Sequence, residues 1–328
     1  MMPVEALTCR GIAALLLLIA AAPAWAQSYP AKPVRIIVPF PPGGSVDVIA
    51  RMVAPKLSES LGQQVVIDNR SGASGNIGTE LAARAAPDGY TLLANTLPLV
   101  TNSFLYSRMP YDAVKDFTPL SVLAASPAVL AVHPSVPARS VRELVQMAKS
   151  KPGLLNYASS GAGTNHHIAG ELLNYLGKIE ITAIHYKGGG PAAIANLSGE
   201  VGINWPNVVA IVPYVKAGRI RALGVTSARR SAAMPEVPTI AEAGVAGLAG
   251  YDFTPWQIMV APTGTPAAIV AQLNEHLVKA MRSPDIVERS ARDGADVIAS
   301  SHEQAVKHLQ SEMDKWRRVI KERGMRAE

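Results

Sequence analysis

Residues 34–45 read VRIIVPFPPGGS and mark a strand that runs into a glycine-rich loop. The β-branched run Val34–Val38 predicts a short buried strand. After the loop, apolar residues recur at the spacing of one buried helical face, at Val46, Ile49, Ala50, Val53 and Leu57. A strand, a loop and a helix in this order form the first half of a βαβ unit. The stretch therefore predicts a parallel sheet covered by helices.

The alternation of strand and helix patterns continues on both sides of a long apolar segment. That segment, residues 120–132, is interrupted at Ser126 and Pro127 and predicts two strands or one bent strand. The patterns around it predict strands at 64–68, 90–94, 155–158, 181–184, 220–225 and 256–261, and helices at 77–85, 140–150, 164–176 and 191–197. Three further helices follow, the last with a capping box that begins at Ser301. A second βαβ set thus repeats the first.

The N-terminal residues have the order of a secretory signal peptide. Arg10 precedes an apolar run, residues 12–22, that is too short to cross a bilayer, and Ala24-Trp25-Ala26 supplies a cleavage site. We therefore expect cleavage after residue 26 and a periplasmic location. The only cysteine, Cys9, precedes the apolar run, so we expect no disulfide and no thiolate chemistry in the mature chain.

The composition favours a small anionic ligand over a nucleic acid. The net charge is +6, and a basic surface helps an anion approach. Only 5% of the residues are aromatic, which argues against stacking sites for single-stranded nucleic acid. No apolar segment after the signal peptide reaches membrane-spanning length. We expect a soluble monomer that binds no nucleic acid, metal or cofactor.

Three loops share one design, because each follows a predicted strand, is rich in glycine and leads into a helix. They are residues 41–45, 159–164 and 187–191. Glycine lets the backbone approach a ligand closely, and the free N–H groups and positive end of a helix favour an anion. In open α/β sheets such loops lie at the carboxyl ends of strands, where ligands bind. The three loops predict a site for a negatively charged group.

The glycine spacing fits no nucleotide or hydrolase motif. The chain has no G-x-x-x-x-G-K-[ST] motif, and a G-x-G-x-x-G pattern that begins at Gly161 fails at His166. The turn at residues 72–76 lacks the final glycine of a nucleophile elbow. His167 and Glu171 could hold a metal at i, i+4, but no third ligand has suitable spacing, so a surface pair is favoured.

Several single residues leave two interpretations open. Asp47 could bind a ligand ammonium, although a carboxylate in the first helical turn favours a capping role. His166 lies beside the second loop and could donate a hydrogen bond to a ligand. Trp205 and Trp256 are either pocket walls or core residues. The amide of Asn207 could bind a ligand or a water molecule.

The chain resembles the Bug-type receptors of tripartite tricarboxylate transporters over nearly all of its mature length. The first motif that carries the resemblance is IVPFPPGG at 37–44, followed by Asp47. The other matching motifs are NRSGASGNIG at 69–78, PDGYTL at 87–92, NYASSG at 156–161, YKGGGPA at 186–192, KAGRIRAL at 216–223 and PTIAEAG at 238–244. The motifs occur in the same order as in the family, which makes the resemblance specific.

The resemblance implies an α/β fold of the two-domain periplasmic-binding-protein type (type II, Venus-flytrap) with hinge strands. We expect the signal peptide at 1–26, one domain at 27–127 plus 254–328, and the other at 128–253. A small organic carboxylate would be held between the domains, which close about the hinge and deliver it to two integral-membrane transporter subunits. Carried over by position, the ligand-binding residues are Pro42, Gly43, Asp47, Ser74, Thr96, Ser159, Gly163, Thr164, His166, Lys187, Gly188, Gly190 and Asn207.

Two departures from the family pattern fall near the expected pocket. The chain has Asn204-Trp205-Pro206 and Asn95-Thr96-Leu97-Pro98 at these places, and Trp205 and Leu97 suggest a bulkier or more apolar carboxylate. Two other functions stay open beside the transport receptor, which is not an enzyme. A sensor would dock a membrane signalling partner instead. A hydrolase would use Ser159 and His166, but the sequence shows no orienting acid for them.

Overall fold

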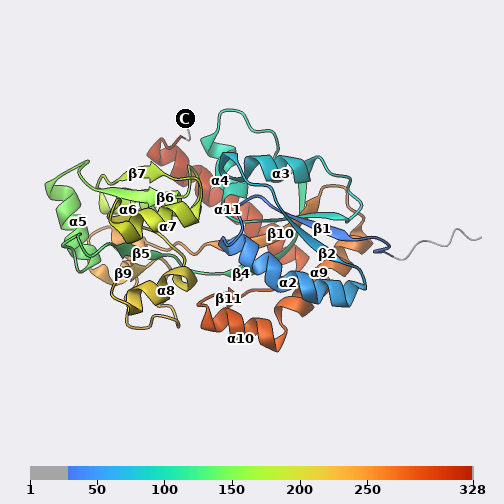
Figure 1. Ribbon diagram of the computed structural model, residues 1–328. Coiled ribbons are helices and arrows are strands. Elements are labelled where there is room, and N and C mark those ends of the chain that lie inside the picture. The colour runs from blue at the N-terminus through green and yellow to red at the C-terminus, as the bar shows by residue number, and fades with distance from the viewer. Residues whose placement is uncertain (1–28, 327–328) are drawn as a thin grey trace, which may run out of the picture. The chain divides into compact units, whose positions relative to one another are not determined.

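The structure is a computed structural model that describes residues 29–326. The predicted signal peptide, residues 1–26 with Cys9, lies outside the described residues. The chain divides into the units Met1–Ala31 and Lys32–Glu328, and every helix and strand below belongs to the second unit. That unit contains two β-sheets with helices packed around them (Figure 1). Among the described helices, none is both long and apolar enough to span a bilayer.

Six strands form the first sheet, in the order β11-β4-β10-β3-β1-β2. Their bounds are β1 (Val34–Val38), β2 (Val65–Asn69), β3 (Thr91–Asn95), β4 (Phe117–Ala125), β10 (Trp256–Pro262) and β11 (Asp296–Val297). β1 pairs in parallel with both β2 and β3, which confirms the predicted parallel unit. β10 runs antiparallel between β3 and β4, so the complete sheet is mixed.

Five strands form the second sheet, in the order β7-β6-β8-β5-β9. Their bounds are β5 (Val129–Val132), β6 (Asn156–Ser159), β7 (Thr182–His185), β8 (Ile203–Asn204) and β9 (Arg221–Val225). β6 pairs in parallel with β7 and β8, and β5 is antiparallel to β8. The trio β7-β6-β8 thus has the arrangement of β2-β1-β3, each flanked by one antiparallel strand. The predicted repetition of the first βαβ set is confirmed.

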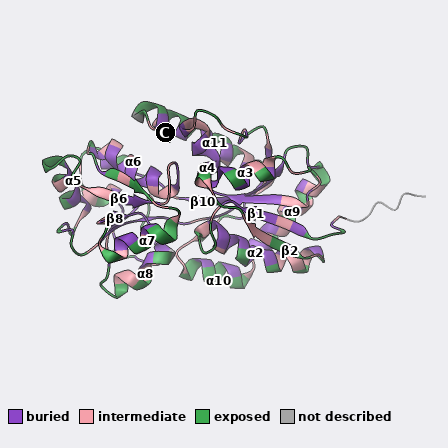
Figure 2. Ribbon diagram, turned by 45° about the horizontal axis from the view of Figure 1, so that its top comes forward, coloured by how far each residue is buried: buried purple, intermediate pink, exposed green. Residues whose placement is uncertain are grey.

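The helices cover the sheets and bury the strands. Those that follow strands of the first sheet are α2 (Ser45–Leu61), α3 (Asn76–Ala83), α4 (Pro98–Leu105), α9 (Ala267–Met281), α10 (Pro284–Arg292) and α11 (His302–Arg323). Those that follow strands of the second sheet are α5 (Val141–Ser150), α6 (Asn165–Gly177), α7 (Gly189–Ser198) and α8 (Val208–Lys216). Short 3-10 helices lie at Ala73–Gly75, Ala241–Ala243 and Leu248–Gly250. Most strands lie in the buried interior (Figure 2): every residue of β5, β8 and β10 is buried, whereas β7 at the edge of its sheet is largely exposed.

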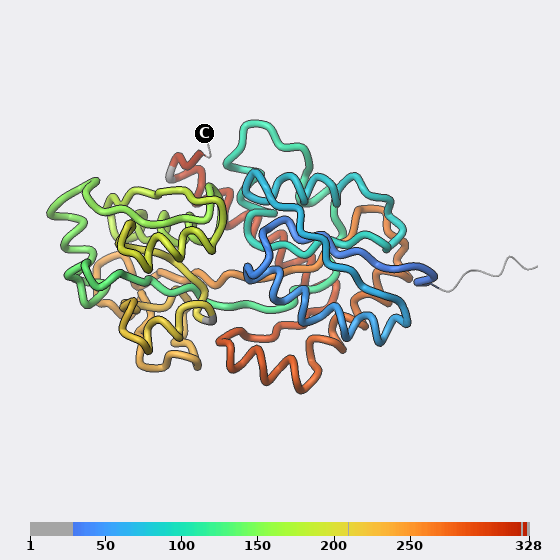
Figure 3. The backbone as a smooth tube through the Cα atoms, viewed as in Figure 1, coloured from blue at the N-terminus to red at the C-terminus, as the bar shows by residue number. Residues whose placement is uncertain are grey.

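The chain crosses between the sheets twice. The apolar segment 120–132 forms two strands that belong to different sheets, β4 and β5, and the chain returns between β9 and β10. The two connections lie side by side (Figure 3), since the Ser126 N–H donates to the Pro255 carbonyl at 2.9 Å. Next to them, Glu312 of α11 accepts from the indole N–H groups of Trp256 and Trp316 at 2.8 and 2.9 Å. α11 begins with the predicted capping box at Ser301, and through Glu312 it contacts the crossing at Trp256.

Candidate functional site

The carboxyl ends of six parallel strands meet around one cavity of about 930 Å³. β1, β2 and β3 contribute loop residues from Pro39 to Gly44, from Ser71 to Gly75, and Thr96 with Pro98. β6, β7 and β8 contribute Ser160 and Gly161 with Thr164, residues 186–188, and Pro206 with Asn207. Ligands of open α/β sheets bind outside the carboxyl ends of the strands. Here two sheets present those ends to the same space.

The helices that follow these loops begin at the cavity with their N–H groups uncapped. Gly44, Thr164 and Gly188 are the N-cap residues of α2, α6 and α7, and among the described residues no side chain caps these three helices. Ser140 and Ser301 cap α5 and α11, whereas α9 and α10 also lack a side-chain cap within the described chain although their first residues do not line the cavity, so α2, α6 and α7 are distinguished by where they begin. The first N–H groups of a helix lack intrahelical partners. At α2, α6 and α7 they are available to an anion.

The side chains that line the cavity reinforce this preference for an anion. Lys187 lines it with a basic side chain. In the described part of the chain, no Asp or Glu lines the cavity. Charge of one sign in a cleft with low-dielectric walls focuses the field and raises the local concentration of the opposite ion. Lys187 and the helix ends therefore act in the same direction.

Glycines allow the loops of the two sheets to come into contact. Gly188 has φ +114°, and a Cβ there would lie 3.4 Å from Cγ of Pro41 in the first loop. Gly161 has φ +125°, and a Cβ there would lie 3.0 Å from Oγ of Ser74. Both backbone conformations are ones that residues with side chains rarely adopt. The cavity wall is therefore closed by backbone at these two points.

Two adjacent histidines play different parts. His166 lines the cavity, and its buried Nδ1 has no hydrogen-bond partner among the described residues. Burial lowers the pKa of His166 to about 4, so the ring is neutral at pH 7 and can both donate and accept. His167 is buried away from the cavity, where its Nδ1 accepts from the Gly163 N–H at 3.0 Å. Its ring packs edge-on against His185, with 5.0 Å between the ring centroids.

The structure brings most of the predicted ligand-binding residues to this cavity. Those that line it are Pro42, Gly43, Ser74, Thr96, Thr164, His166, Lys187, Gly188, Gly190 and Asn207. The sequence analysis did not single out Asn165 and Tyr186, which also line it. Their position carried a signal, because each adjoins a predicted site residue at the start of a helix or the end of a strand. The three remaining predicted residues lie behind the cavity wall.

Asp47 and Ser159 stabilise the first and second glycine-rich loops through hydrogen bonds and do not line the cavity. The Asp47 carboxylate accepts from the Gly43 N–H at 2.9 Å, the Asn69 amide at 2.8 Å and Arg51 at 2.9 Å. Burial raises the pKa of Asp47, but the hydrogen bonds from Arg51 and Gly43 outweigh burial and leave that pKa below its ordinary value. Ser159 Oγ donates to the Gly161 carbonyl and accepts from the Gly161 N–H, so the serine is occupied by its own loop.

Gly163 joins the second loop to α4 of the first sheet. Its carbonyl accepts from Oγ1 of Thr101 at 2.8 Å. Its φ is +74°, and a Cβ would lie 2.6 Å from Cδ1 of Leu105 and 2.7 Å from Oδ1 of Asn102. Glycine is therefore required here by a close approach between helices and loop, and not by contact with the cavity.

Two expectations of the sequence analysis change, and one open alternative is settled. Trp205, Trp256 and Leu97 are core residues with 1%, 3% and 0% exposure, and none of them lines the cavity, so a bulkier carboxylate does not follow from Trp205 and Leu97. The interpretation of His167 and Glu171 as a surface pair is wrong, because His167 is buried and its Nδ1 is taken by Gly163. The reason is common to all of them: sequence spacing gives the position on an element but not which face another element covers.

Comparisons with known proteins point in one direction. The model of a family described as tripartite tricarboxylate transporter family receptor matches residues 49–325. The structure of Rpa4515 of R. palustris with adipate is 38% identical with a TM-score of 0.85, covering 91% of this chain and 99% of that one. The structure of the periplasmic binding protein BugD is 30% identical with a TM-score of 0.84, covering 91% of this chain and 99% of that one. The structure of MatC (Rpa3494) from Rhodopseudomonas palustris with bound malate is 31% identical with a TM-score of 0.83, covering 89% of this chain and 100% of that one. These matches confirm the predicted fold class.

The close packing of Gly163 generates a stability prediction. Gly163→Ala should lower the free energy of unfolding by about 1–3 kcal/mol, because the new methyl group overlaps Leu105 and the left-handed backbone disfavours a side chain. Urea denaturation measures the change. Gly250→Ala is the control, since a Cβ at Gly250 meets no atom within 4 Å. Equal stability of the two variants would contradict the assignment.

The buried histidines generate a pH prediction. Burial lowers the pKa of His167 to about 4, whereas histidine in an unfolded chain titrates near 6.5. Between these values the unfolded chain binds a proton that the folded chain does not, so the free energy of unfolding falls as pH falls from 6.5 to 4. His167→Gln should reduce this fall by up to about 3 kcal/mol. Denaturant titrations at pH 6.5 and 4.5 test this. If the free energy of unfolding falls as much in the variant as in the unaltered protein, the prediction is wrong.

Proposed function

Because this chain belongs to the tripartite tricarboxylate transporter receptor family, we propose that it captures a small organic carboxylate in the cavity between its two sheets. Hinge closure about the crossing strands would present the loaded receptor to the integral-membrane subunits of its transporter. The resemblance to Bug-type receptors is confirmed by the family match and by BugD. The family is one of periplasmic receptors, and the chain is assigned to the periplasm accordingly.

One observation supports this function above the others. Three uncapped helix starts, drawn from both sheets, meet at a cavity lined by Lys187 and by no acidic residue in the described chain. This arrangement suits a carboxylate, which accepts hydrogen bonds at both oxygens. Two structurally similar proteins were solved with adipate and with malate bound. Their ligands are carboxylates, and the same class is proposed for this chain.

The proposed ligand contacts are the predicted residues that line the cavity, from Pro42 and Gly43 to Asn207. Asp47, Ser159 and Gly163 would support the loops without touching the ligand. The proposed domains are residues 27–127 plus 254–328 and residues 128–253. The two chain crossings support this division, since β4 and β10 belong to one sheet and β5 and β9 to the other.

The proposed receptor acts as a monomer with a cleaved signal peptide and without catalysis. The hydrolase alternative requires a free nucleophile at Ser159. That side chain is fully buried and exchanges hydrogen bonds with Gly161 of its own loop. His166, the second member of the hydrolase pair, instead lines the cavity as a neutral ring that suits ligand binding.

A screen of organic acids by thermal shift tests the function directly. A ligand that binds only the folded protein raises the unfolding temperature, and the shift grows with the logarithm of the ligand concentration relative to Kd. We expect at least one small carboxylate to raise it, with neutral and cationic analogues of equal size giving no shift. If no acid in the screen raises the unfolding temperature, the protein is not a carboxylate receptor.

Lys187 provides a matched test of charge in the cavity. Lys187→Gln should weaken binding of the best carboxylate roughly three- to tenfold, because it removes the basic side chain from the cavity lining. Lys149→Gln removes the same charge from the exposed face of α5 and should leave the affinity unchanged. Calorimetric titration measures both. Equal losses in the two variants would show that overall charge, and not this position, matters.

A further inference from the structure

A second, smaller pocket opens beside the main cavity at the crossing strands. Its volume is about 90 Å³, and it shares Gly43, Ser45, Asn207 and Ala210 with the main cavity. We call this space the hinge pocket, because Ser126 and Gln257 of the crossing region line it.

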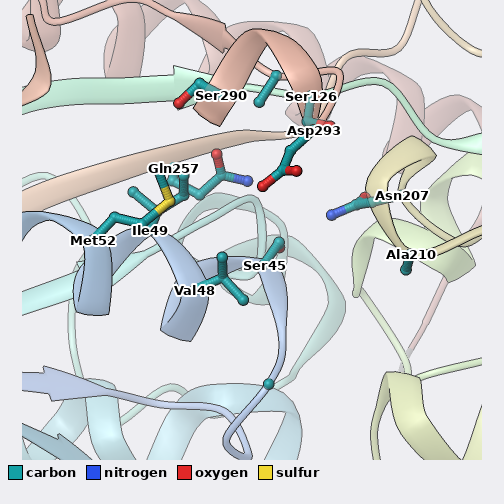
Figure 4. Close-up of a pocket in the computed structure, with 12 residues that line it drawn as sticks. Ser45, Val48, Ile49, Met52, Ser126, Asn207, Ala210, Gln257, Ser290 and Asp293 are labelled. Atoms are coloured by element: carbon teal, nitrogen blue, oxygen red, sulfur yellow. The ribbon is translucent and has the colours of Figure 1, made fainter. Parts of the chain in front are cut away.

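The hinge pocket runs along one face of α2. Val48, Ile49 and Met52 form its apolar side, and Ser45 marks the end that it shares with the cavity (Figure 4). From Ser45 to Met52 the helix rises about 10 Å at 1.5 Å per residue. A ligand anchored at the start of α2 can therefore extend a short aliphatic chain along these side chains.

The far end of the hinge pocket carries polar groups without partners. Gln257 is 2% exposed, and neither its Nε2 nor its Oε1 has a hydrogen-bond partner among the described residues. Ser290 of α10 is 1% exposed, and its Oγ is likewise unpartnered within the described chain. Buried polar side chains in proteins are nearly always hydrogen-bonded. A mostly apolar pocket with a few polar groups that fix orientation is the usual form of a ligand-binding site.

Charge decides which end group fits. Figure 4 shows the Asp293 carboxylate pointing into the hinge pocket toward the amides of Gln257 and Asn207. Asp293 also forms long ion pairs with Arg289 at 3.7 Å and Arg292 at 3.9 Å. Neither arginine lines the hinge pocket, so the Asp293 carboxylate is the charged side chain among the described lining residues. A second carboxylate would be repelled, whereas a hydrogen-bond donor would be attracted.

We propose that the hinge pocket binds the far end of the ligand, and that the ligand is an aliphatic monocarboxylate whose other end is an uncharged hydrogen-bond donor. This inference rests on the proposed receptor function. The carboxylate lies at the helix starts. A terminal carboxamide or hydroxyl donates to Asp293 and pairs with the Gln257 amide, which offers both a donor and an acceptor. The pocket thereby selects against dicarboxylates of the same length.

Pairs of acids that differ only at the far end test the proposal. Succinate, glutarate and adipate are each compared with their monoamides by calorimetric titration at pH 7, using protein expressed from the full-length chain. At the length that reaches Gln257, the monoamide should bind at least tenfold more tightly than the diacid. A diacid that binds as tightly as its monoamide at every length would overturn the proposal.

Two variants locate the preference in the hinge pocket. Asp293→Asn should reduce the preference for the amide to less than threefold, because the repulsion of the diacid is removed. Gln257→Met keeps the size of the side chain and should weaken the monoamide about tenfold. Glu288→Gln removes an exposed charge from α10, the helix that ends just before Asp293, and should leave both affinities unchanged. Thermal unfolding without ligand shows whether each variant is folded, and the comparison on the unaltered protein stands if one is not.

The outcomes separate this inference from the proposed function. If diacids bind tightly and none of the variants alters their affinity, the chain is still a carboxylate receptor and the hinge-pocket proposal is wrong. If no acid of either series or of the wider screen binds, the receptor function fails and the hinge-pocket proposal fails with it.

Discussion

The backbone N–H groups at the starts of α2, α6 and α7 are the feature on which the rest of this structure depends. They lack side-chain caps among the described residues, and the helices begin at residues that line one cavity, following strands of two different sheets. A helix start left without a partner is costly when it is shielded from water. The glycine loops, the buried Asp47 behind the first loop and the absence of acidic lining residues in the described chain all preserve that arrangement for an anion.

The crossing between the sheets lies beside this anion site. Both connections pass through one place, where Ser126 bonds to the Pro255 carbonyl and Glu312 receives two indole N–H groups. The hinge pocket lies at the same place, lined by residues from the first sheet, from α10 and from α8. A ligand that reached it would contact the anion site and the crossing strands together. Ligand length and lobe closure would then be physically coupled.

One hydrogen bond and two close approaches between loops also connect the two sheets beside the cavity. Thr101 of α4 donates to the Gly163 carbonyl, and Gly188 and Gly161 approach Pro41 and Ser74 of the opposite loops. These contacts involve backbone and small side chains, which leaves room for a ligand between the loops. They also explain why predicted residues such as Gly163 matter to the site without lining it.

The sequence by itself determined the local elements and the chemistry of the loops. Strand and helix periodicities gave the parallel trios around β1 and β6, and glycine runs before helices marked the anion site, because both signals are local. Only the tertiary structure showed that Trp205 and Leu97 face the core, that Asp47 supports a loop, and that Gln257, Ser290 and Asp293 share a pocket. Those residues lie far apart in the chain. Their environments depend on which faces the two sheets and α10 cover, and no periodicity along the sequence encodes that packing.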